Sequence, residues 1–271
     1  MNDFEARLNS LDLTLFQHVV SQTTEGDKRS LLGLQRALRE ANREKGYVYL
    51  EIGSYLGGSL QPYVADPLCH KIISIDPRPR SLPDIRGAVS YAENTTENML
   101  RGLRQIPEAN LEKLVTVEEG TDTLSAAAIQ FRPALCFVDG EHTDAAVLRD
   151  SLFCQSVLKG SGWIVYHDAN IIYDGLLAFI NALEKVGTSF CIYNFEDSIF
   201  LIELGDCRLS ESGWMTDLRR SSAQGYLWSL HANDLYRQFY HRRVCQFFRS
   251  VEMRVWNRIF KRPATKSGTP P

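Results

Sequence analysis

The sequence predicts an α/β protein built on a Rossmann-like, doubly wound sheet of mainly parallel strands. Short apolar runs alternate with helical patterns five times along the chain, and alternating β and α units form parallel sheets covered by helices on both faces. Two later runs, 190–193 and 198–202, flank Asn194-Phe-Glu-Asp197, which is a hairpin signal. Polar residues follow most of the strands, and ligands of such sheets lie at the carboxyl ends of the strands.

The elements follow in a regular order. Residues 1–46 carry two apolar sets at helical spacing and form a helical cap that Gly46 ends before the first strand. The expected strands are 47–52, 71–76, 114–118, 134–138 and 163–166. The expected helices are 59–69, 94–103, 124–129, 143–158 and 171–186. The segment 77–90 contains three prolines and three arginines and shows no regular pattern.

Composition narrows the class of protein. The apolar fraction is 44% and the net charge is −3, so a full core is expected and nucleic-acid binding is not. The six cysteines are scattered without a C-x-x-C pair and are expected to be reduced thiols. The chain begins without a basic region and apolar run, and Asp174 and Asn181 interrupt the longest apolar tract. We therefore expect no signal peptide and no membrane span, and a cytoplasmic protein.

Four regions follow from these patterns: the cap at 1–46, a ligand-binding domain at 47–205, a basic helical extension at 206–262 and a disordered tail at 263–271. Residues 233–262 hold eight basic and two acidic side chains, a net charge of +6, beside apolar residues at helical spacing. One interpretation is a helix that packs on the domain or on a second subunit of a homo-oligomer. The other is a helix that docks on an anionic membrane surface or an acidic partner.

The first strand runs into a glycine turn. Gly53, Gly57 and Gly58 precede Ser59, and such a turn brings backbone N–H groups close to a ligand. A dinucleotide-binding turn has glycine where this chain has Tyr55, which disfavours a nicotinamide cofactor and makes Tyr55 a wall of the pocket. Glu51 at the strand tip would repel phosphate but suits a cationic ligand, which points to S-adenosylmethionine.

Asp76 ends the second strand, 23 residues after Gly53. An acid about 20 residues after the glycine turn hydrogen-bonds ribose in nucleotide-binding βαβ units. The alternative is an exposed turn residue before Pro77.

Further polar residues are expected at the same edge of the sheet, because parallel strands end together. They are Asp122, Asp139, His142, His167 and Asp168. Asp139 and Asp168 are candidates for metal binding or catalysis, or else are helix N-caps. His142 is a general base or a residue that orients the loop, and His167 is a hydrogen-bonded core residue or a catalytic one.

Four motifs in order resemble those of the class I S-adenosylmethionine-dependent methyltransferases. They are Glu51-Ile-Gly-Ser-Tyr-Leu-Gly-Gly-Ser59, Ile73-Ser-Ile-Asp76, Phe137-Val-Asp-Gly-Glu-His142, and a strand that ends in His167-Asp168. The resemblance covers about residues 45–205. It is to the group of macrocin-type sugar O-methyltransferases and cephalosporin-hydroxylase-like proteins.

The resemblance implies roles for particular residues. Glu51, Gly53 and Ser59 would surround the methionine part of the cofactor, together with Tyr55 and Gly57 of the same turn. Asp76 would hold the ribose hydroxyls, and Thr121 with Asp122 would flank the adenine. Asp139 belongs to the cofactor site as well.

The resemblance also implies a divalent cation, Mg²⁺, held by Asp139 and Asp168 in metal-dependent members of this fold. Related chains carry a third ligand directly after the second acid, where this chain has Ala169, and Asn170 follows one place later. Asn170 is therefore the candidate third ligand.

The expected function is S-adenosylmethionine-dependent O-methylation of a hydroxylated small molecule or sugar, with Asp139, His142 and Asp168 as the catalytic residues. One alternative is hydroxylase-like chemistry on the same fold. The other is a non-catalytic cofactor-binding or scaffold protein that acts through its basic C-terminal helix.

Overall fold

The computed structural model describes residues 3–206 apart from 86, 92 and 196, residues 208–211, and residues 225–251 apart from 227, 228, 231, 236, 237, 240, 241 and 249. The chain divides into two compact units, residues 1–230 and 231–271. The first unit contains the sheet and all of the named helices and strands.

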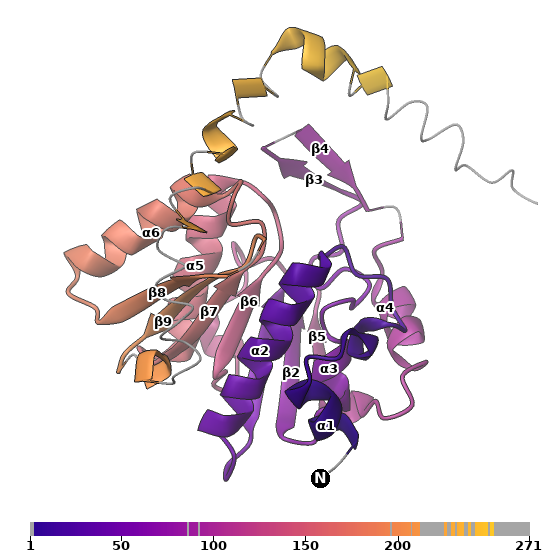
Figure 1. Ribbon diagram of the computed structural model, residues 1–271. Helices are drawn as coiled ribbons and strands as arrows, with labels where there is room; N and C mark the ends of the chain where they lie inside the picture. The colour runs from indigo at the N-terminus through magenta and orange to yellow at the C-terminus, as the bar shows by residue number, and fades with distance from the viewer. Residues whose placement is uncertain are drawn as a thin grey trace, which may run out of the picture. The chain divides into compact units, whose positions relative to one another are not determined.

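The sheet has seven strands in the order β5-β2-β1-β6-β7-β9-β8 (Figure 1). Five strands run parallel, and β9 and β8 close the sheet as an antiparallel pair beside β7. Their bounds are β1 Tyr47–Ile52, β2 Cys69–Ile75, β5 Leu114–Val117, β6 Leu135–Val138, β7 Gly162–Tyr166, β8 Phe190–Asn194 and β9 Phe200–Leu204. The predicted fold class is confirmed, and each predicted strand lies within two residues of an observed one.

Helices cover both faces of this sheet (Figure 1). One face carries α1 (Asp3–Asn9), α2 (Glu25–Ala41), α3 (Gln61–Ala65) and α4 (Thr96–Leu103), and the other carries α5 (Asp144–Leu158) and α6 (Tyr173–Lys185). The alternation of side chains along the central strands produces these two cores. In β6, Leu135 and Phe137 enter the first core, whereas Cys136 and Val138 enter the second.

Local sequence signals fix the ends of the helices. Thr24 begins α2 with a capping box, in which its hydroxyl accepts from the Asp27 N–H and the Asp27 carboxylate accepts from the Thr24 N–H. Thr143 caps α5 and Thr95 caps α4. Short 3₁₀ turns lie at η1 (Leu13–Phe16), η2 (Leu111–Lys113) and η4 (Arg208–Glu211). The cysteines that the structure describes are free thiols.

Three local predictions need correction. The segment 77–90 contains a two-stranded hairpin, β3 (Ser81–Asp84) and β4 (Gly87–Ser90). The helix expected at 124–129 is a single 3₁₀ turn, η3 (Ala126–Ala128), which has no buried residue to hold a longer helix in place. The helix expected at 59–69 is shortened to α3, which ends before the buried Asp66.

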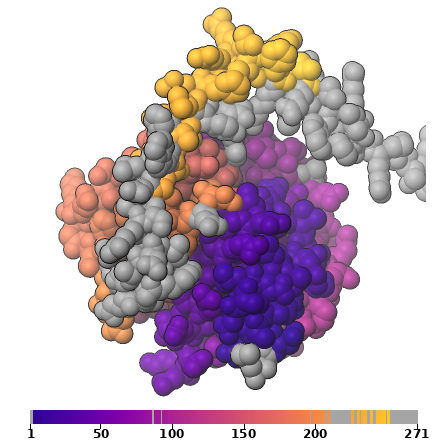
Figure 2. Space-filling view, in the orientation of Figure 1, coloured from indigo at the N-terminus to yellow at the C-terminus, as the bar shows by residue number. Residues whose placement is uncertain are grey.

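The N-terminal cap packs against the sheet as part of the first unit. Phe4, Leu8 and Phe16 are buried in the first core together with the apolar face of α2. In the space-filling view, the indigo N-terminal residues form a continuous part of the surface (Figure 2). The cap therefore belongs to the folded body that positions the site.

The second unit is described only in part. Residues 232–235 and 243–248 are helical, and several of its apolar side chains are exposed: Leu235, Phe239, Val244, Phe247, Phe248 and Val251. Residues 252–271, which include the last part of the predicted basic segment, 252–262, and the predicted tail, lie outside the described residues. Docking of this segment on a membrane, a partner or a second subunit stays a prediction. None of the helices in the described parts of the chain is long and apolar enough to cross a membrane.

Candidate active site

A cavity of about 1070 Å³ opens at the carboxyl ends of the parallel strands. It lies where β1 separates β2 on one side from β6 on the other, which is the point where the strand order reverses and where such sheets bind ligands. Its wall includes most of the residues predicted for the site: Gly53, Tyr55, Ser59, Asp76, Thr121, Asp122, Asp139, His142, His167, Asp168 and Asn170. Glu51 and Gly57 are not part of this lining.

Gly53 is required by the packing of two strand ends. Its φ is +88°, and a Cβ at this position would lie 2.2 Å from the Asp139 carbonyl oxygen and 2.5 Å from the Gly140 Cα. The turns after β1 and β6 therefore approach so closely that no side chain fits between them. A Cβ on Gly57 would instead meet Met99 and Leu103 of α4, so this glycine serves the packing of the turn on a helix.

Glu51 lies beneath the cavity floor. It is completely buried, and its carboxylate accepts hydrogen bonds from the Tyr49 hydroxyl at 2.5 Å and the Ser59 hydroxyl at 2.6 Å. Burial raises the pKa of Glu51 to about 8, against the lowering effect of these two hydrogen bonds. At neutral pH the ligand-free protein therefore holds this group largely uncharged, and its visible role is to tie the turn at Ser59 to β1. Contact with the cofactor stays a prediction.

Glu51→Gln is expected to remove a pH-dependent loss of stability. A carboxyl whose pKa rises from 4.5 to about 8 on folding stabilises the fold fully below pH 4.5, and this contribution is lost as pH rises to about 8. Relative to the wild type, the variant should therefore gain about 1.4 kcal/mol in free energy of unfolding per pH unit across that window. Denaturant melts at several pH values measure this gain. Glu44→Gln, which alters an exposed glutamate, is the control, and a gain independent of pH would contradict the burial argument.

Asp76 lines the cavity with a carboxylate that already has four donors. One oxygen accepts from the Tyr55 N–H at 2.8 Å and the Arg78 guanidinium at 3.3 Å. The other accepts from the Arg78 N–H at 2.8 Å and the Asn94 amide at 3.3 Å. An ionised carboxylate offers about four acceptor positions, so ribose hydroxyls would have to replace or share one of these donors. Asp76 anchors the Tyr55 turn, and the predicted ribose contact stays a prediction.

Thr121 and Asp122 lie in the exit turn of β5, on the cavity wall. The Thr121 hydroxyl donates to the buried Asp150 carboxylate and accepts from the Arg149 guanidinium at 2.9 Å. The position of this turn is therefore fixed by α5. The predicted adenine contact of these two residues is consistent with their place and stays a prediction.

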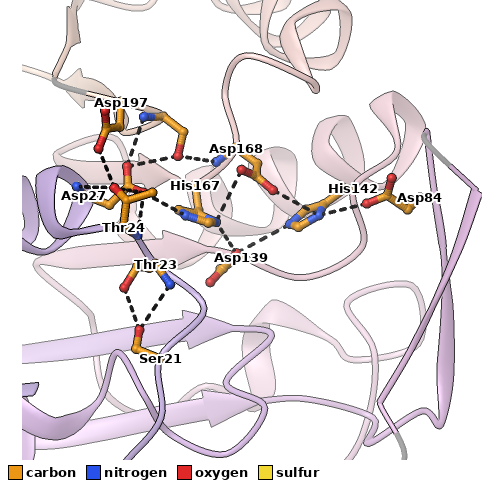
Figure 3. Close-up of polar contacts among 11 residues, drawn as sticks. Ser21, Thr23, Thr24, Asp27, Asp84, Asp139, His142, His167, Asp168 and Asp197 are labelled. Carbon is orange, nitrogen blue, oxygen red and sulfur yellow. Dashed lines mark hydrogen bonds and ion pairs between the residues drawn. The ribbon is translucent and has the colours of Figure 1, made fainter. Parts of the chain in front are cut away.

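Asp139, His142, His167 and Asp168 form one cluster after β6 and β7 (Figure 3). Asp139 Oδ1 lies 2.9 Å from His167 Nδ1 and 3.5 Å from His142 Nε2. Asp168 lies 3.4 Å from His142 and 3.8 Å from His167. The sequence correctly predicts that these residues meet. His167, which it left between a core and a catalytic role, is both buried and part of the cavity wall.

The charges in this cluster depend on one another. Burial lowers the pKa of His142, but the carboxylates of Asp139 and Asp84 raise it to about 9. Burial likewise opposes the charged form of His167, and the neighbouring carboxylates raise its pKa well above the usual value. Burial raises the pKa of Asp139, but the two imidazoles lower it to about 2. These pKa shifts favour protonated imidazoles beside an ionised Asp139 at neutral pH, so His142 is set to donate hydrogen bonds rather than to accept a proton.

Two acids that the sequence pattern did not indicate complete the cluster. Asp27 of α2 approaches His167, and Asp84 of β3 approaches His142 (Figure 3). Neither follows a strand of the main sheet, so topology did not point to them. The Thr24-x-x-Asp27 capping pattern was visible in the sequence, but nothing in it indicated that Asp27 faces the cavity.

The predicted ligand set of Asp139, Asp168 and Asn170 differs from the group that the geometry brings together. Among the described residues, Asp139, His142 and His167 each offer a ligand atom, and these atoms lie within 4.8 Å of one another. Asn170 lines the cavity with a buried side-chain oxygen that has no hydrogen-bond partner. Asp139 is thus common to both sets, and the roles of Asp168 and Asn170 as metal ligands stay predictions.

Comparison with known proteins identifies the domain. Residues 50–169 match the model of a family described as a methyltransferase domain. This stretch runs from β1 to the end of β7 and contains the glycine turn, Asp76, Thr121, Asp139, His142 and His167. No curated protein matches the sequence.

Three solved structures are similar to this chain, and the first of them supports the same fold. The O-methyltransferase NovP is 12% identical, with a TM-score of 0.53 over 74% of this chain and 99% of that one. A calicheamicin methyltransferase is 14% identical, with a TM-score of 0.48 over 75% of this chain and 92% of that one. MycE from the mycinamycin pathway, in complex with Mg, S-adenosylhomocysteine and mycinamycin VI, is 13% identical, with a TM-score of 0.48 over 73% of this chain and 54% of that one.

Proposed function

We propose that the protein, which is a class I S-adenosylmethionine-dependent methyltransferase, transfers a methyl group to a hydroxyl oxygen of a small molecule or sugar. The observation that carries this proposal is the ionised Asp139 carboxylate in the wall of a large cavity at the switch point of the sheet. Support for oxygen as the acceptor atom comes from the likeness of the fold to an O-methyltransferase. The resemblance of the motifs to macrocin-type enzymes supports a sugar or another hydroxylated molecule.

The β1–β2 half of the cavity suits the cofactor. The Ser54 hydroxyl is buried there without a hydrogen-bond partner, and a buried polar group of this kind is normally satisfied by a ligand or water. Ser54, Tyr55 and Asp76 would hold the amino-acid and ribose parts, and Thr121 with Asp122 would hold the adenine. When bound, S-adenosylmethionine supplies an electrophilic methyl group on a sulfonium that leaves readily.

The β6–β7 half of the cavity suits the acceptor. An ionised carboxylate such as Asp139 accepts a hydrogen bond from an acceptor hydroxyl, which orients the oxygen lone pair and draws off the proton as the new bond forms. The protonated imidazoles of His142 and His167 lie beside Asp139. Their positive charge would lower the pKa of an acceptor hydroxyl bound there and so assist the loss of its proton. Asp139 therefore aligns the acceptor and receives its proton, and the two histidines assist the loss of that proton.

The group of possible metal ligands does not fit the expected Mg²⁺. Mg²⁺ takes oxygen ligands in near-octahedral geometry, whereas the three side chains whose ligand atoms converge, Asp139, His142 and His167, offer one carboxylate and two imidazoles. The roles proposed for Asp139, His142 and His167 do not require Mg²⁺.

A second candidate function is hydroxylation, which the same cluster favours. Two histidines and one carboxylate around a divalent iron are typical of oxygenases. Such a reaction would take dioxygen and a two-electron reductant. Uptake of dioxygen by the iron-loaded protein in the presence of acceptor would support it, and methyl transfer without uptake of dioxygen would exclude it.

The test of the proposed function is methylation of a panel of sugars, nucleotide-linked sugars and catechols with S-adenosylmethionine. Formation of S-adenosylhomocysteine, matched by a product with one added O-methyl group, is the expected result. Methyl transfer to nitrogen or carbon in place of oxygen, located by NMR of the product, would contradict the assignment of the acceptor.

A further inference from the structure

Three possible metal ligands converge from two neighbouring strand ends. Asp139 and His142 lie in the turn after β6, and His167 follows β7, so all three are positioned by the central sheet (Figure 3). One ligand atom from each lies within 4.8 Å of the other two. A separation of this size allows a single ion to contact all three atoms.

Each imidazole is held on its outer side by a separate carboxylate. His142 Nδ1 lies 3.3 Å from Asp84 Oδ2, and His167 Nε2 lies 3.4 Å from Asp27 Oδ2. These contacts fix the orientation of the two rings. Histidines that bind metals commonly have such a carboxylate on the nitrogen that faces away from the ion, because it fixes the tautomer and makes the ligand more basic.

The two outer carboxylates are themselves fixed. Asp27 accepts from the Ser198 N–H and the Ser198 hydroxyl, both at 3.0 Å, and its hydrogen bonds to Thr24 cap α2. The β3–β4 hairpin that carries Asp84 is tied to the site because the Ile85 N–H donates to the His142 carbonyl at 3.1 Å. The contacts that hold the histidines thus come from three separate parts of the fold.

The inner nitrogens of both rings are buried and face the same carboxylate oxygen. His142 Nε2 and His167 Nδ1 lie 3.5 and 2.9 Å from Asp139 Oδ1, but neither makes a hydrogen bond of normal geometry. Buried polar atoms without partners are uncommon, and each one needs an explanation, such as a bound ion. Here two of them face one carboxylate oxygen.

We propose that Asp139, His142 and His167 bind a divalent transition metal, of the class of Zn²⁺, Co²⁺, Fe²⁺ or Mn²⁺, in preference to Mg²⁺. Imidazole nitrogen suits these ions, whereas Mg²⁺ selects oxygen. Four carboxylates surround the two rings (Asp27, Asp84, Asp139 and Asp168), and this concentration of negative charge favours a dication. Binding of the ion goes beyond the proposed function and is measured without methyl transfer. In the ion-loaded protein, the ion would take the place of the two imidazole protons beside the acceptor oxygen.

The test uses the full-length protein without a histidine tag, treated with a chelator and titrated with Co²⁺, Zn²⁺, Mn²⁺ and Mg²⁺ by calorimetry. The expected result is one ion per chain with a Kd of about 1 μM or below for Co²⁺ and Zn²⁺. Mg²⁺ should bind at least about 100-fold more weakly. The visible spectrum of the cobalt-loaded wild type should show ligand-field bands without a strong thiolate charge-transfer band, because the chain also contains six cysteines.

Variants identify the ligands. His142→Ala and His167→Ala should each abolish tight binding and the cobalt spectrum, and Asp84→Asn should weaken binding about 10- to 100-fold. His70→Ala, which removes an exposed histidine at the start of β2, should change nothing. If His167→Ala fails to fold, His142→Ala and the spectrum of the cobalt-loaded wild type still show whether histidines bind the ion.

Two outcomes would overturn the proposal. One is equal affinity for Mg²⁺ and Zn²⁺ that persists in the two histidine variants. The other is the absence of any tight ion in a folded protein that still binds S-adenosylhomocysteine, which would leave the proposed function intact and show the cluster to be a proton-bridged network.

Discussion

Asp139→Asn should lower the rate of methyl transfer by about 10²- to 10⁴-fold, the range found when a positioned acid or base is removed. The Asp139 side chain lies in contact range of both His142 and His167, and its pKa of about 2 keeps it ionised at neutral pH. Asparagine has nearly the same size but carries no charge and cannot take up the proton of an acceptor. The rate at saturating cofactor is the measurement.

The effect should be on the rate rather than on the fold. Glu119→Gln, which removes one negative charge from the wall of the same cavity, is the matched control and should stay within a few-fold of the wild type. Circular dichroism and binding of S-adenosylhomocysteine show whether the variant is folded. A loss of less than about tenfold, well below the usual range for such a residue, would contradict the role given to Asp139.

Gly53→Ala should produce the largest loss of stability among simple substitutions at the site. The new Cβ would lie 2.2 Å from the Asp139 carbonyl oxygen and 2.5 Å from the Gly140 Cα, at a φ of +88°. Both neighbours are backbone atoms of the turn after β6, so relief requires that β1 and β6 move apart. We expect a loss of about 3 to 5 kcal/mol in the free energy of unfolding and loss of cofactor binding.

Gly160→Ala separates the two causes of this loss, which are the steric clash of the new Cβ and the strain of the left-handed backbone. Gly160 has a φ of +84°, close to that of Gly53, but a Cβ there would meet nothing within 4 Å. Its substitution should cost only the strain of the left-handed backbone, about 1 to 2 kcal/mol. Denaturant melts measure both losses. If the two substitutions lower the free energy of unfolding equally, the close approach of the two turns does not contribute to the loss at Gly53.

The sheet could be predicted from sequence because its strands are short apolar runs whose side chains alternate between two cores. The runs at β6 and β7 are buried on both faces, and this signal depends only on neighbouring residues. The hairpin of β3 and β4 could not be predicted in the same way. Its side chains are mostly exposed, so no alternation marks it, and Pro83 argues against a strand.

The residues of the site also fall into two groups, those that the sequence pattern predicts and those that depend on tertiary packing. Asp76, Asp139, His142 and Asp168 were predictable because parallel strands end at one edge of the sheet. Asp27 and Asp84 were not, because they reach the cluster through the packing of α2 and of the β3–β4 hairpin, which local sequence does not encode. The burial of Glu51 also depends on tertiary packing, and it changes the residue from the expected negative group into a largely neutral one.

The measurement that tests the central claim most directly is calorimetric titration of the purified protein with S-adenosylhomocysteine, with and without a divalent cation, on the wild type and on Asp76→Ala. We expect one molecule bound per chain with a Kd of about 1 to 100 μM, and loss of binding in the variant, because Asp76 lines the cavity and anchors the Tyr55 turn in its wall. The absence of binding to the folded wild-type protein in both metal conditions would contradict the assignment of this cavity as a methyltransferase cofactor site.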